Sequence, residues 1–457
     1  MGGTDRRASG LRHSVSQTVT VSSVRLRWHA VFPCHGIRVS SSDTPGLGHT
    51  GRQMSTEASH PQQVVSAPRG FIPALEGMRG FAALGVLVTH VAFQTGATGD
   101  PVLGRIWGRF DMAVALFFAL SGFLLWRPHA VAARGLGSTP PVARYLMHRA
   151  ARILPAYWVA VVLILLFLPE AGGGLQVWLA NLGLAQVFVP LTLTGGLTQM
   201  WSLSVEVAFY ALLPLIALAF VGLRGATARL RVPVLLGAAA LSLGWVFVPV
   251  PTPEAIHSDN WLPGYLPWFA AGMVLAELTL QVDGPVHRLA RRRVLMGAIA
   301  VAAFALSCTD LAGPEGLTRA EPWQYSVKIA LGAVLAFALL APLVLGDTEK
   351  HRILASPLSL TIGRWSYGLF IWHLAVLSII FPVFGIVPFS GSFVFVLVVT
   401  TCLSLAVASA SYALVEEPTR LAVKNWERRR NARAARAEEA SGNAASPTAT
   451  TAISAGS

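Results

Sequence analysis

One stretch of the sequence carries an arginine and a histidine in an otherwise mainly apolar run. Residues 79–95 include Arg79 and His90, which are eleven residues apart. In a helix with 3.6 residues per turn, this spacing puts both side chains on one face, about 16 Å apart along the axis. An imidazole placed in this way can act as a general base, although a single buried histidine also occurs as a structural residue. The shared face favours the functional role.

A second group of polar residues is spaced as on one face of a helix. Near the start of another apolar run, every fourth residue is polar: Ser202, Glu206 and Tyr210. Residues at this interval are neighbours on a helix surface. Glu206 could orient an imidazole or bind a sugar hydroxyl. It could equally cap or pair near the start of the helix, and the sequence leaves both interpretations open.

A second histidine lies within the apolar run at 366–388. His373 stands about a third of the way into this run, where it could line a cavity together with Tyr367 and Trp372. Packing without any chemical role explains the same three residues equally well.

Two arginines precede the apolar run that begins at residue 153. Arg149 and Arg152 are three residues apart and would form a two-pronged cationic site suited to phosphates. Basic residues beside a membrane span also set its topology, so these two could have that role alone.

The composition indicates that the elements carrying these residues lie in a membrane. Of the 457 residues, 54% are hydrophobic and only 12% are charged, and the mean hydropathy is +0.57. A soluble domain carries about 25% charged residues. The net charge of +13 could indicate nucleic-acid binding or arginine-rich cytoplasmic loops. The placement of the charges favours loops, so we expect a lipid bilayer and no nucleic acid as partner.

Apolar runs long enough to cross a bilayer predict the fold class. They fall at 79–95, 111–126, 153–168, 203–222, 233–250, 262–280, 294–311, 326–345, 366–388 and 391–415. An eleventh, shorter run lies at 177–191. The expected fold is therefore an all-α membrane protein with about ten transmembrane helices.

Arginine placement decides whether the eleventh run crosses. Basic residues concentrate in alternate connections, at 127–152, 223–231, 281–293 and 346–364. This alternation follows the positive-inside rule only if 177–191 does not cross. We therefore expect a short re-entrant or interfacial segment there, and both ends of the chain in the cytoplasm. The connection 96–110, with Arg105 and Arg109, is the exception.

The ends of the chain differ from its middle. Residues 1–70 lack the apolar core of a signal peptide. We expect a disordered N-terminal extension there, a membrane domain over 71–420 and a disordered cytoplasmic tail over 421–457. The three cysteines have no spacing typical of a metal site or disulfide framework, so no metal is expected.

Short motifs spread over residues 71–420 resemble the acyltransferase 3 family, membrane O-acyltransferases that modify bacterial glycans, lipids and macrolides. They are Leu-Glu-Gly-Met-Arg-Gly at 75–80, Arg79 with His90, Phe-Phe-Ala-Leu-Ser-Gly-Phe-Leu at 117–124, Arg-Ala-Ala-Arg-Ile-Leu-Pro at 149–155, Trp-Ser-Leu-Ser-Val-Glu at 201–206, Ser-Tyr-Gly-Leu-Phe-Ile-Trp-His at 366–373 and Glu-Glu-Pro at 416–418. Their common order makes the resemblance specific. Two positions depart from the family pattern: Glu76 replaces an aspartate, and His148 replaces the first arginine of Arg-Arg-x-x-Arg.

The resemblance implies transfer of an acyl group, most simply acetyl, from cytoplasmic acyl-CoA to a hydroxyl at the outer side of a bacterial inner membrane. Acyl-CoA would be a co-substrate and not a permanently bound cofactor. Carried over by position, the resemblance assigns catalysis to His90, Glu206 and His373, and donor binding to Arg79, Arg149 and Arg152. The acceptor would be a glycan, a glycolipid or a macrolide sugar; the segment 72–96 is similar to actinobacterial members that acetylate trehalose mycolates.

A transporter or flippase for a lipid-linked glycan is the alternative function, because buried histidine and glutamate residues also form proton relays. Many transporters carry inverted repeats, and no internal repeat is visible in this sequence.

Overall fold

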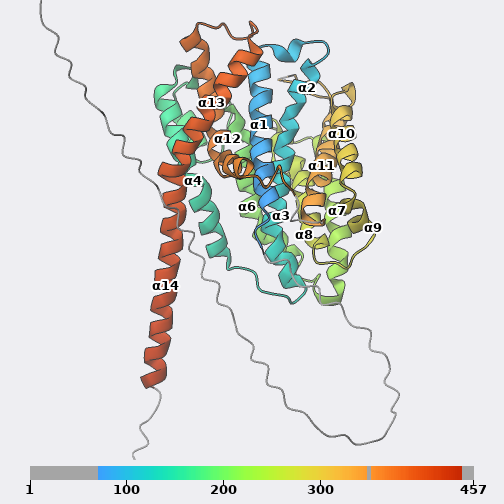
Figure 1. Cartoon of the computed structure of the whole chain (residues 1–457), viewed down its shortest axis with the longest axis vertical. Coiled ribbons are helices and arrows are strands. Elements are labelled where there is room, and N and C mark those ends of the chain that lie inside the picture. Colours follow the sequence, from blue (N-terminus) through green and yellow to red (C-terminus); the bar gives the residue numbers. More distant parts are fainter. Residues whose placement is uncertain (1–69, 317, 347–350, 445–457) are drawn as a thin grey trace, which may run out of the picture. The chain divides into compact units, whose positions relative to one another are not determined.

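The chain is helical throughout the part that the structure describes. The computed structural model describes residues 70–316, 318–346 and 351–444, which form α-, 3-10 and π-helices joined by turns, without a β-strand (Figure 1). The predicted all-α class is therefore confirmed. The proposed extension over 1–70 lies outside the described residues, apart from Gly70.

Each of the ten predicted spans overlaps one helix. These are α1 (Pro73–Gln94), α3 (Ala113–Ala133), α4 (Val142–Phe167), α6 (Trp201–Ala219), α7 (Arg231–Ser242), α8 (Leu262–Leu278), α10 (Arg293–Ser307), α11 (Pro322–Val344), α12 (Pro357–Phe384) and α13 (Phe393–Ser411). Several begin with proline at the first helical turn, where the missing N–H costs no hydrogen bond. Within the described residues, seven helical segments are long and apolar enough to cross a membrane. Helices α1, α8 and α10 are not among them, so the count of ten and the orientation stay predictions.

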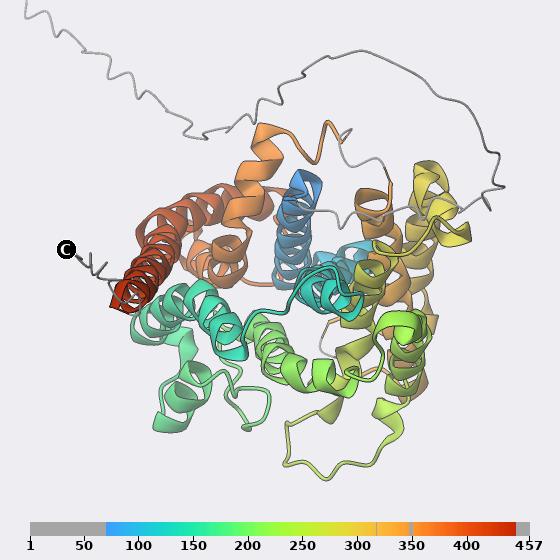
Figure 2. The same cartoon turned by 90° about the horizontal axis from the view of Figure 1, so that it is seen from below.

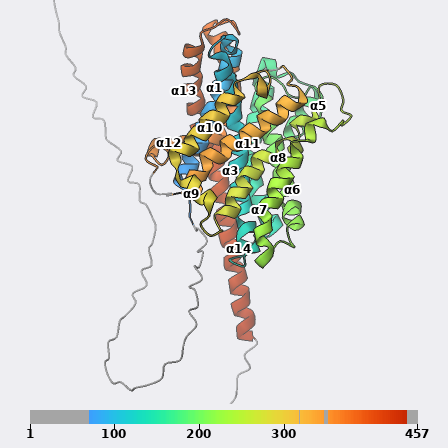
Figure 3. The ribbon, with the colours of Figure 1, turned by 90° about the vertical axis from the view of Figure 1, so that its right-hand side faces the viewer.

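The segment 177–191 does not form a spanning helix. Its first part belongs to α5 (Leu175–Leu182), and turns follow. Eight residues extend over about 12 Å, whereas the hydrocarbon core is about 30 Å thick. Helix α5 lies at the end of the bundle opposite to the one where the last helix, α14 (Glu417–Ala444), leaves it (Figure 3).

The two arginines that broke the charge alternation are held by partners. Arg109 ends the short helix α2 (Gly104–Arg109) and is fully buried, and its Nε donates to the carbonyl oxygen of Ser307 at 2.5 Å. It also pairs with Glu315 at 3.4 Å. Arg105 pairs with Asp310 at 2.7 Å. Both therefore fasten the 96–110 connection to the end of α10 and the residues that follow it.

Helix α8 is enclosed by protein on nearly all sides. All its residues except Pro263 and Leu266 are buried. Glycines allow its backbone to approach α3 closely: a Cβ on Gly272 would lie 1.8 Å from the carbonyl oxygen of Ala119, and one on Gly122 would lie 2.1 Å from that of Phe269. Small residues of this kind permit close packing of membrane helices. Its apolar character all round fits a buried position.

Helices α1 and α12 run side by side in the same direction. Seen along the bundle, α1 lies between α12 and α3 (Figure 2). A Cβ on Gly80 would lie 3.0 Å from the backbone nitrogen of Gly363, so the two backbones almost touch there. Ten residues further along each helix stand His90 and His373. The glycine contact therefore sets the register that brings these histidines to one level.

Gly363→Ala is expected to disturb this register. Its Cβ would lie 2.1 Å from the carbonyl oxygen of Glu76, and overpacking of this kind costs about 1–3 kcal/mol. In the matched control Gly297→Ala, in α10, no atom lies within 4 Å of the new Cβ, so stability should stay equal or rise by about 0.4–1 kcal/mol. Thermal unfolding in detergent compares the two. Equal stability of both variants would contradict the close helix contact.

The end of the chain corrects one prediction. We expected a disordered tail from residue 421, but α14 extends as a helix to Ala444, and a π-helix over Tyr412–Glu416 connects it to α13. Alanine, arginine and glutamate, which are strong helix formers, dominate this stretch. Arg420 also pairs with Glu417 one turn away, at 2.6 Å. Residues 445–457 lie outside the described part.

Candidate active site

Two histidines from distant parts of the sequence meet between α1 and α12. Nε2 of His373 lies 3.2 Å from Nδ1 of His90, and the ring centroids are 5.0 Å apart. His373 is buried, whereas His90 is only partly buried. His90 is therefore the member of the pair that a substrate can reach, and His373 stands behind it.

The surrounding hydrogen bonds assign the tautomer of each neutral ring. Nδ1 of His373 faces two carbonyl oxygens, those of Phe370 at 2.8 Å and Leu369 at 3.1 Å, so it carries the proton. Nε2 of His373 is then an acceptor. Nδ1 of His90 faces this acceptor and the carbonyl oxygen of Val86 at 2.8 Å, so it too carries a proton. Nε2 of His90 is left with a free lone pair, which is what a general base needs.

Within the described part of the chain, the hydrogen-bond partners of Glu206 are hydroxyl groups and not an imidazole. Its Oε1 accepts a hydrogen bond from the Tyr210 hydroxyl at 2.5 Å and another from the Ser121 hydroxyl. Glu206 and Tyr210 therefore do lie on one face of α6, as predicted, and this face contacts α3 through Ser121. The residue that contacts the His90 imidazole is His373 and not Glu206. Ser121 was missed because the sequence gives no sign of which helix faces α6.

The three predicted donor-binding arginines are brought together. The charge of Arg152 interacts with those of both Arg79 and Arg149. None of the three forms an ion pair within 4.0 Å with a carboxylate of the described residues, and the Nε atoms of Arg79 and Arg149 are buried without a hydrogen-bond partner there. Arg152 is exposed. Clustered guanidinium groups with unused donors are suited to an anion such as a phosphate.

Glu416 is a further member of this group that we did not assign from the sequence. It ends the π-helix, and its charge interacts with those of Arg152 and Arg79. Its Oε1 is buried without a hydrogen-bond partner among the described residues. π-Helical turns inside α-helices occur frequently at functional sites. The Glu-Glu-Pro motif at 416–418 begins where this turn ends, but the motif does not predict the turn.

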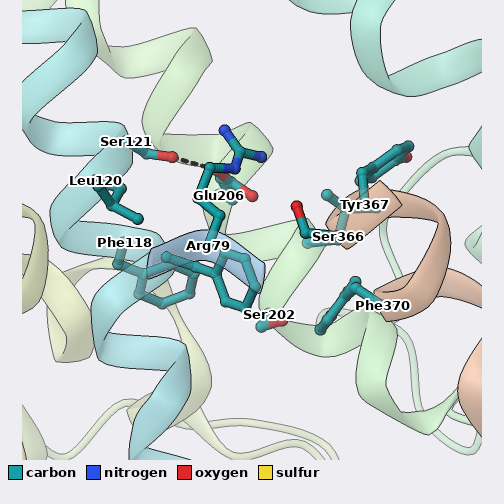
Figure 4. Close-up of a pocket in the computed structure, with 11 residues that line it drawn as sticks. Arg79, Phe118, Leu120, Ser121, Ser202, Glu206, Ser366, Tyr367 and Phe370 are labelled. Atoms are coloured by element: carbon teal, nitrogen blue, oxygen red, sulfur yellow. Dashed lines mark hydrogen bonds between the residues drawn. The ribbon is translucent and has the colours of Figure 1, made fainter. Parts of the chain in front are cut away.

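A cavity of about 40 Å³, large enough for a few water molecules, lies next to Arg79 (Figure 4). Its walls come from α1, α3, α6 and α12 and are formed by Arg79, Phe117, Phe118, Leu120, Ser121, Ser202, Leu203, Glu206, Ser366, Tyr367 and Phe370. Neither His90 nor His373 lines it. The ring of Phe370 lines the cavity, and its centroid lies 6.1 Å from that of the His373 ring, so this side chain neighbours both the arginine side and the histidine side of the site.

Comparisons with known proteins agree with this arrangement. A family model described as an acyltransferase domain, that of the acyltransferase 3 family, matches residues 72–409. The chain is 30% identical over 329 residues to Acyltransferase MdmB of Streptomyces mycarofaciens. This alignment covers 67% of this chain and 79% of that protein. No solved structure matches.

Two more distant relatives carry the name peptidoglycan O-acetyltransferase. The chain is 21% identical to Peptidoglycan O-acetyltransferase OatA of Listeria monocytogenes and 24% identical to Putative peptidoglycan O-acetyltransferase YrhL of Bacillus subtilis. Each match covers 77% of this chain but only 56% and 55% of the relative, so the chain spans a little over half their length. The family match extends over most of the helical part that contains the histidine pair and the arginine cluster. This chain therefore belongs to the acyltransferase 3 family.

Proposed function

We propose that this multi-pass membrane protein moves an acyl group, preferably acetyl, from cytoplasmic acyl-CoA to a hydroxyl of a cell-envelope glycolipid or sugar on the outer side of the bacterial inner membrane. The observation that carries the proposal is the free lone pair on Nε2 of His90, towards one end of α1. Near the other end, Arg79 belongs to a cluster of arginines that have no ion pair with a carboxylate of the described residues. The names of the relatives support an O-acetyltransferase with a sugar hydroxyl as acceptor.

The proposed reaction needs no covalent enzyme intermediate. Arg79, Arg149 and Arg152 would hold the phosphates of the donor. Nε2 of His90 would take the proton of the acceptor hydroxyl while the hydroxyl oxygen attacks the thioester carbonyl. The carbon–sulfur bond then breaks, an ester forms on the acceptor, and the CoA thiolate takes the proton from His90. His373 would hold the His90 ring in the required tautomer throughout, as a positioning residue.

The test is an assay of purified protein with labelled acetyl-CoA and an extract of cell-envelope lipids and glycans. Acyl transfer predicts that free CoA and labelled acceptor appear together, at equal rates. A flippase would move lipid-linked glycan without releasing CoA. Absence of both products in protein that is folded in detergent would refute the proposed function.

Arg152→Ala should mainly weaken donor binding. A hydrogen bond or ion pair to a charged group contributes about 1.5–3 kcal/mol, so we expect the apparent KM for acetyl-CoA to rise about 10- to 100-fold, with a smaller change in kcat. Arg224→Ala, at an exposed arginine outside the cluster, is the matched control. An unchanged KM in Arg152→Ala would leave this arginine only a role in topology.

A further inference from the structure

A carboxylate lies near the His90 end of α1, in the segment that leads into α3. Asp111 belongs to the 3-10 turn Phe110–Met112, directly before α3. The end of α2, which leads into this turn, is fastened to α1 beside the histidine, because the hydroxyl of Thr89, the residue before His90, donates to the carbonyl oxygen of Gly108 at 2.9 Å. One helical turn earlier, a Cβ on Gly85 would lie 3.1 Å from that of Ala113. The charges of Asp111 and His90 are close enough to interact.

The two oxygens of this carboxylate have different surroundings. Oδ2 pairs with Nζ of Lys328, from α11, at 2.6 Å. Oδ1 is buried and has no hydrogen-bond partner among the described residues. Leaving a charged acceptor without a partner costs free energy, so a donor should fill this place in the working enzyme.

The ion pair as a whole is partly exposed, although Oδ1 itself is buried. The Asp111 side chain is 38% exposed and that of Lys328 is 23% exposed. Aromatic residues lie nearby, because the ring of Phe110, the preceding residue, lies 6.1 Å from that of Trp107 and 5.5 Å from that of Phe304. A carboxylate beside aromatic rings suits a hydroxyl-rich, partly apolar ring such as a sugar.

We infer that Oδ1 of Asp111 accepts a hydrogen bond from a second hydroxyl of the acceptor, next to the hydroxyl that His90 deprotonates. This inference rests on the proposed function and makes it more specific: the acceptor carries at least two neighbouring hydroxyls. Water needs no such second contact. Asp111 would thus favour transfer to the acceptor over hydrolysis of the donor.

The experiment measures this preference directly. Purified wild-type protein, Asp111→Asn and Asp310→Asn are each supplied with labelled acetyl-CoA and increasing amounts of envelope extract, and ester formation and acetate release are followed together. Asp111→Asn should lower the ratio of transfer to hydrolysis about 10- to 100-fold, the loss expected for a hydrogen bond to a charged group. It should also raise the apparent KM for the extract and not that for acetyl-CoA. Asp310, 88% exposed and paired with Arg105, serves as the matched control with the wild-type ratio.

Three results would overturn the inference or its basis. An unchanged ratio in Asp111→Asn overturns the role of Asp111, and so does an equal fall of transfer and hydrolysis, which would mean that Asp111 supports the fold or His90 instead. If Asp111→Asn does not fold, Asp111→Glu takes its place in the experiment. This variant keeps the charge but moves it by one methylene, and it should lower the ratio of transfer to hydrolysis to the same extent. A wild-type protein that releases neither ester nor acetate rejects the proposed function itself.

Discussion

His90→Ala should lower kcat for acyl transfer by about 10²- to 10⁴-fold, the usual contribution of a general base. The apparent KM for acetyl-CoA should change little, because the arginine cluster is untouched. Steady-state kinetics of purified protein measures both constants. His257→Ala, at an exposed histidine in a loop, is the matched control.

The double variant separates the two histidines. His373→Ala should reduce kcat less than His90→Ala, because the His90 ring can still hydrogen-bond to the carbonyl of Val86. Adding His373→Ala to His90→Ala should cost nothing more, since residues that act as one unit are not additive. Full turnover of His90→Ala at normal protein levels would remove this residue from the mechanism.

Glu277→Ala should produce the largest loss of stability. This carboxylate is fully buried in α8 and accepts three hydrogen bonds, from Trp126 at 2.7 Å, Arg134 at 2.6 Å and Arg231 at 2.6 Å. It therefore connects α8 with α3 and α7. Removing it leaves Arg231 buried without its counter-charge, and breaking a buried pair in this way costs about 3–5 kcal/mol.

Unfolding in detergent measures this loss against a second glutamate. Glu427 pairs with Arg144 at 3.3 Å and with His148 at 3.0 Å, where the partners are about two-fifths exposed. Glu427→Ala should cost no more than about 1 kcal/mol, as is usual for exposed pairs. If both variants unfold at the same temperature, the buried network does not stabilise the bundle as we infer.

The position of the helices was predictable because a span needs a long apolar run, and such runs are local in the sequence. Each of the ten runs coincides with a helix, and the arginine pattern separated 177–191 from them. Arg105 and Arg109 were exceptions to that pattern. The sequence could not explain them, because their partners, Asp310 and Glu315, lie some two hundred residues away. The α14 helix was missed because its composition, polar all round, is shared by disordered chains and solvated helices.

The site was predictable only in part. Residue type and helical spacing singled out His90, His373, Glu206 and the arginines, and the structure places Arg79 and Glu206 on one cavity. The pairing of His90 with His373 spans 283 residues. It depends on how α1 and α12 pack, which the sequence of either helix alone does not specify. The same holds for Glu206, whose partner Ser121 is fixed by the contact of α3 with α6.

The hydrogen bonds behind His90 also bear on the energetics of turnover. The pair ends on the carbonyl oxygens of Leu369 and Phe370, which have no proton to pass on. In the proposed reaction, the proton received by His90 would leave with the product thiol, by the route along which the thioester came. In that reaction the acetyl group would move outward and a hydrogen atom would move inward, both as parts of neutral groups. The reaction would thus carry no net charge across the bilayer, and the membrane potential would neither drive nor oppose it.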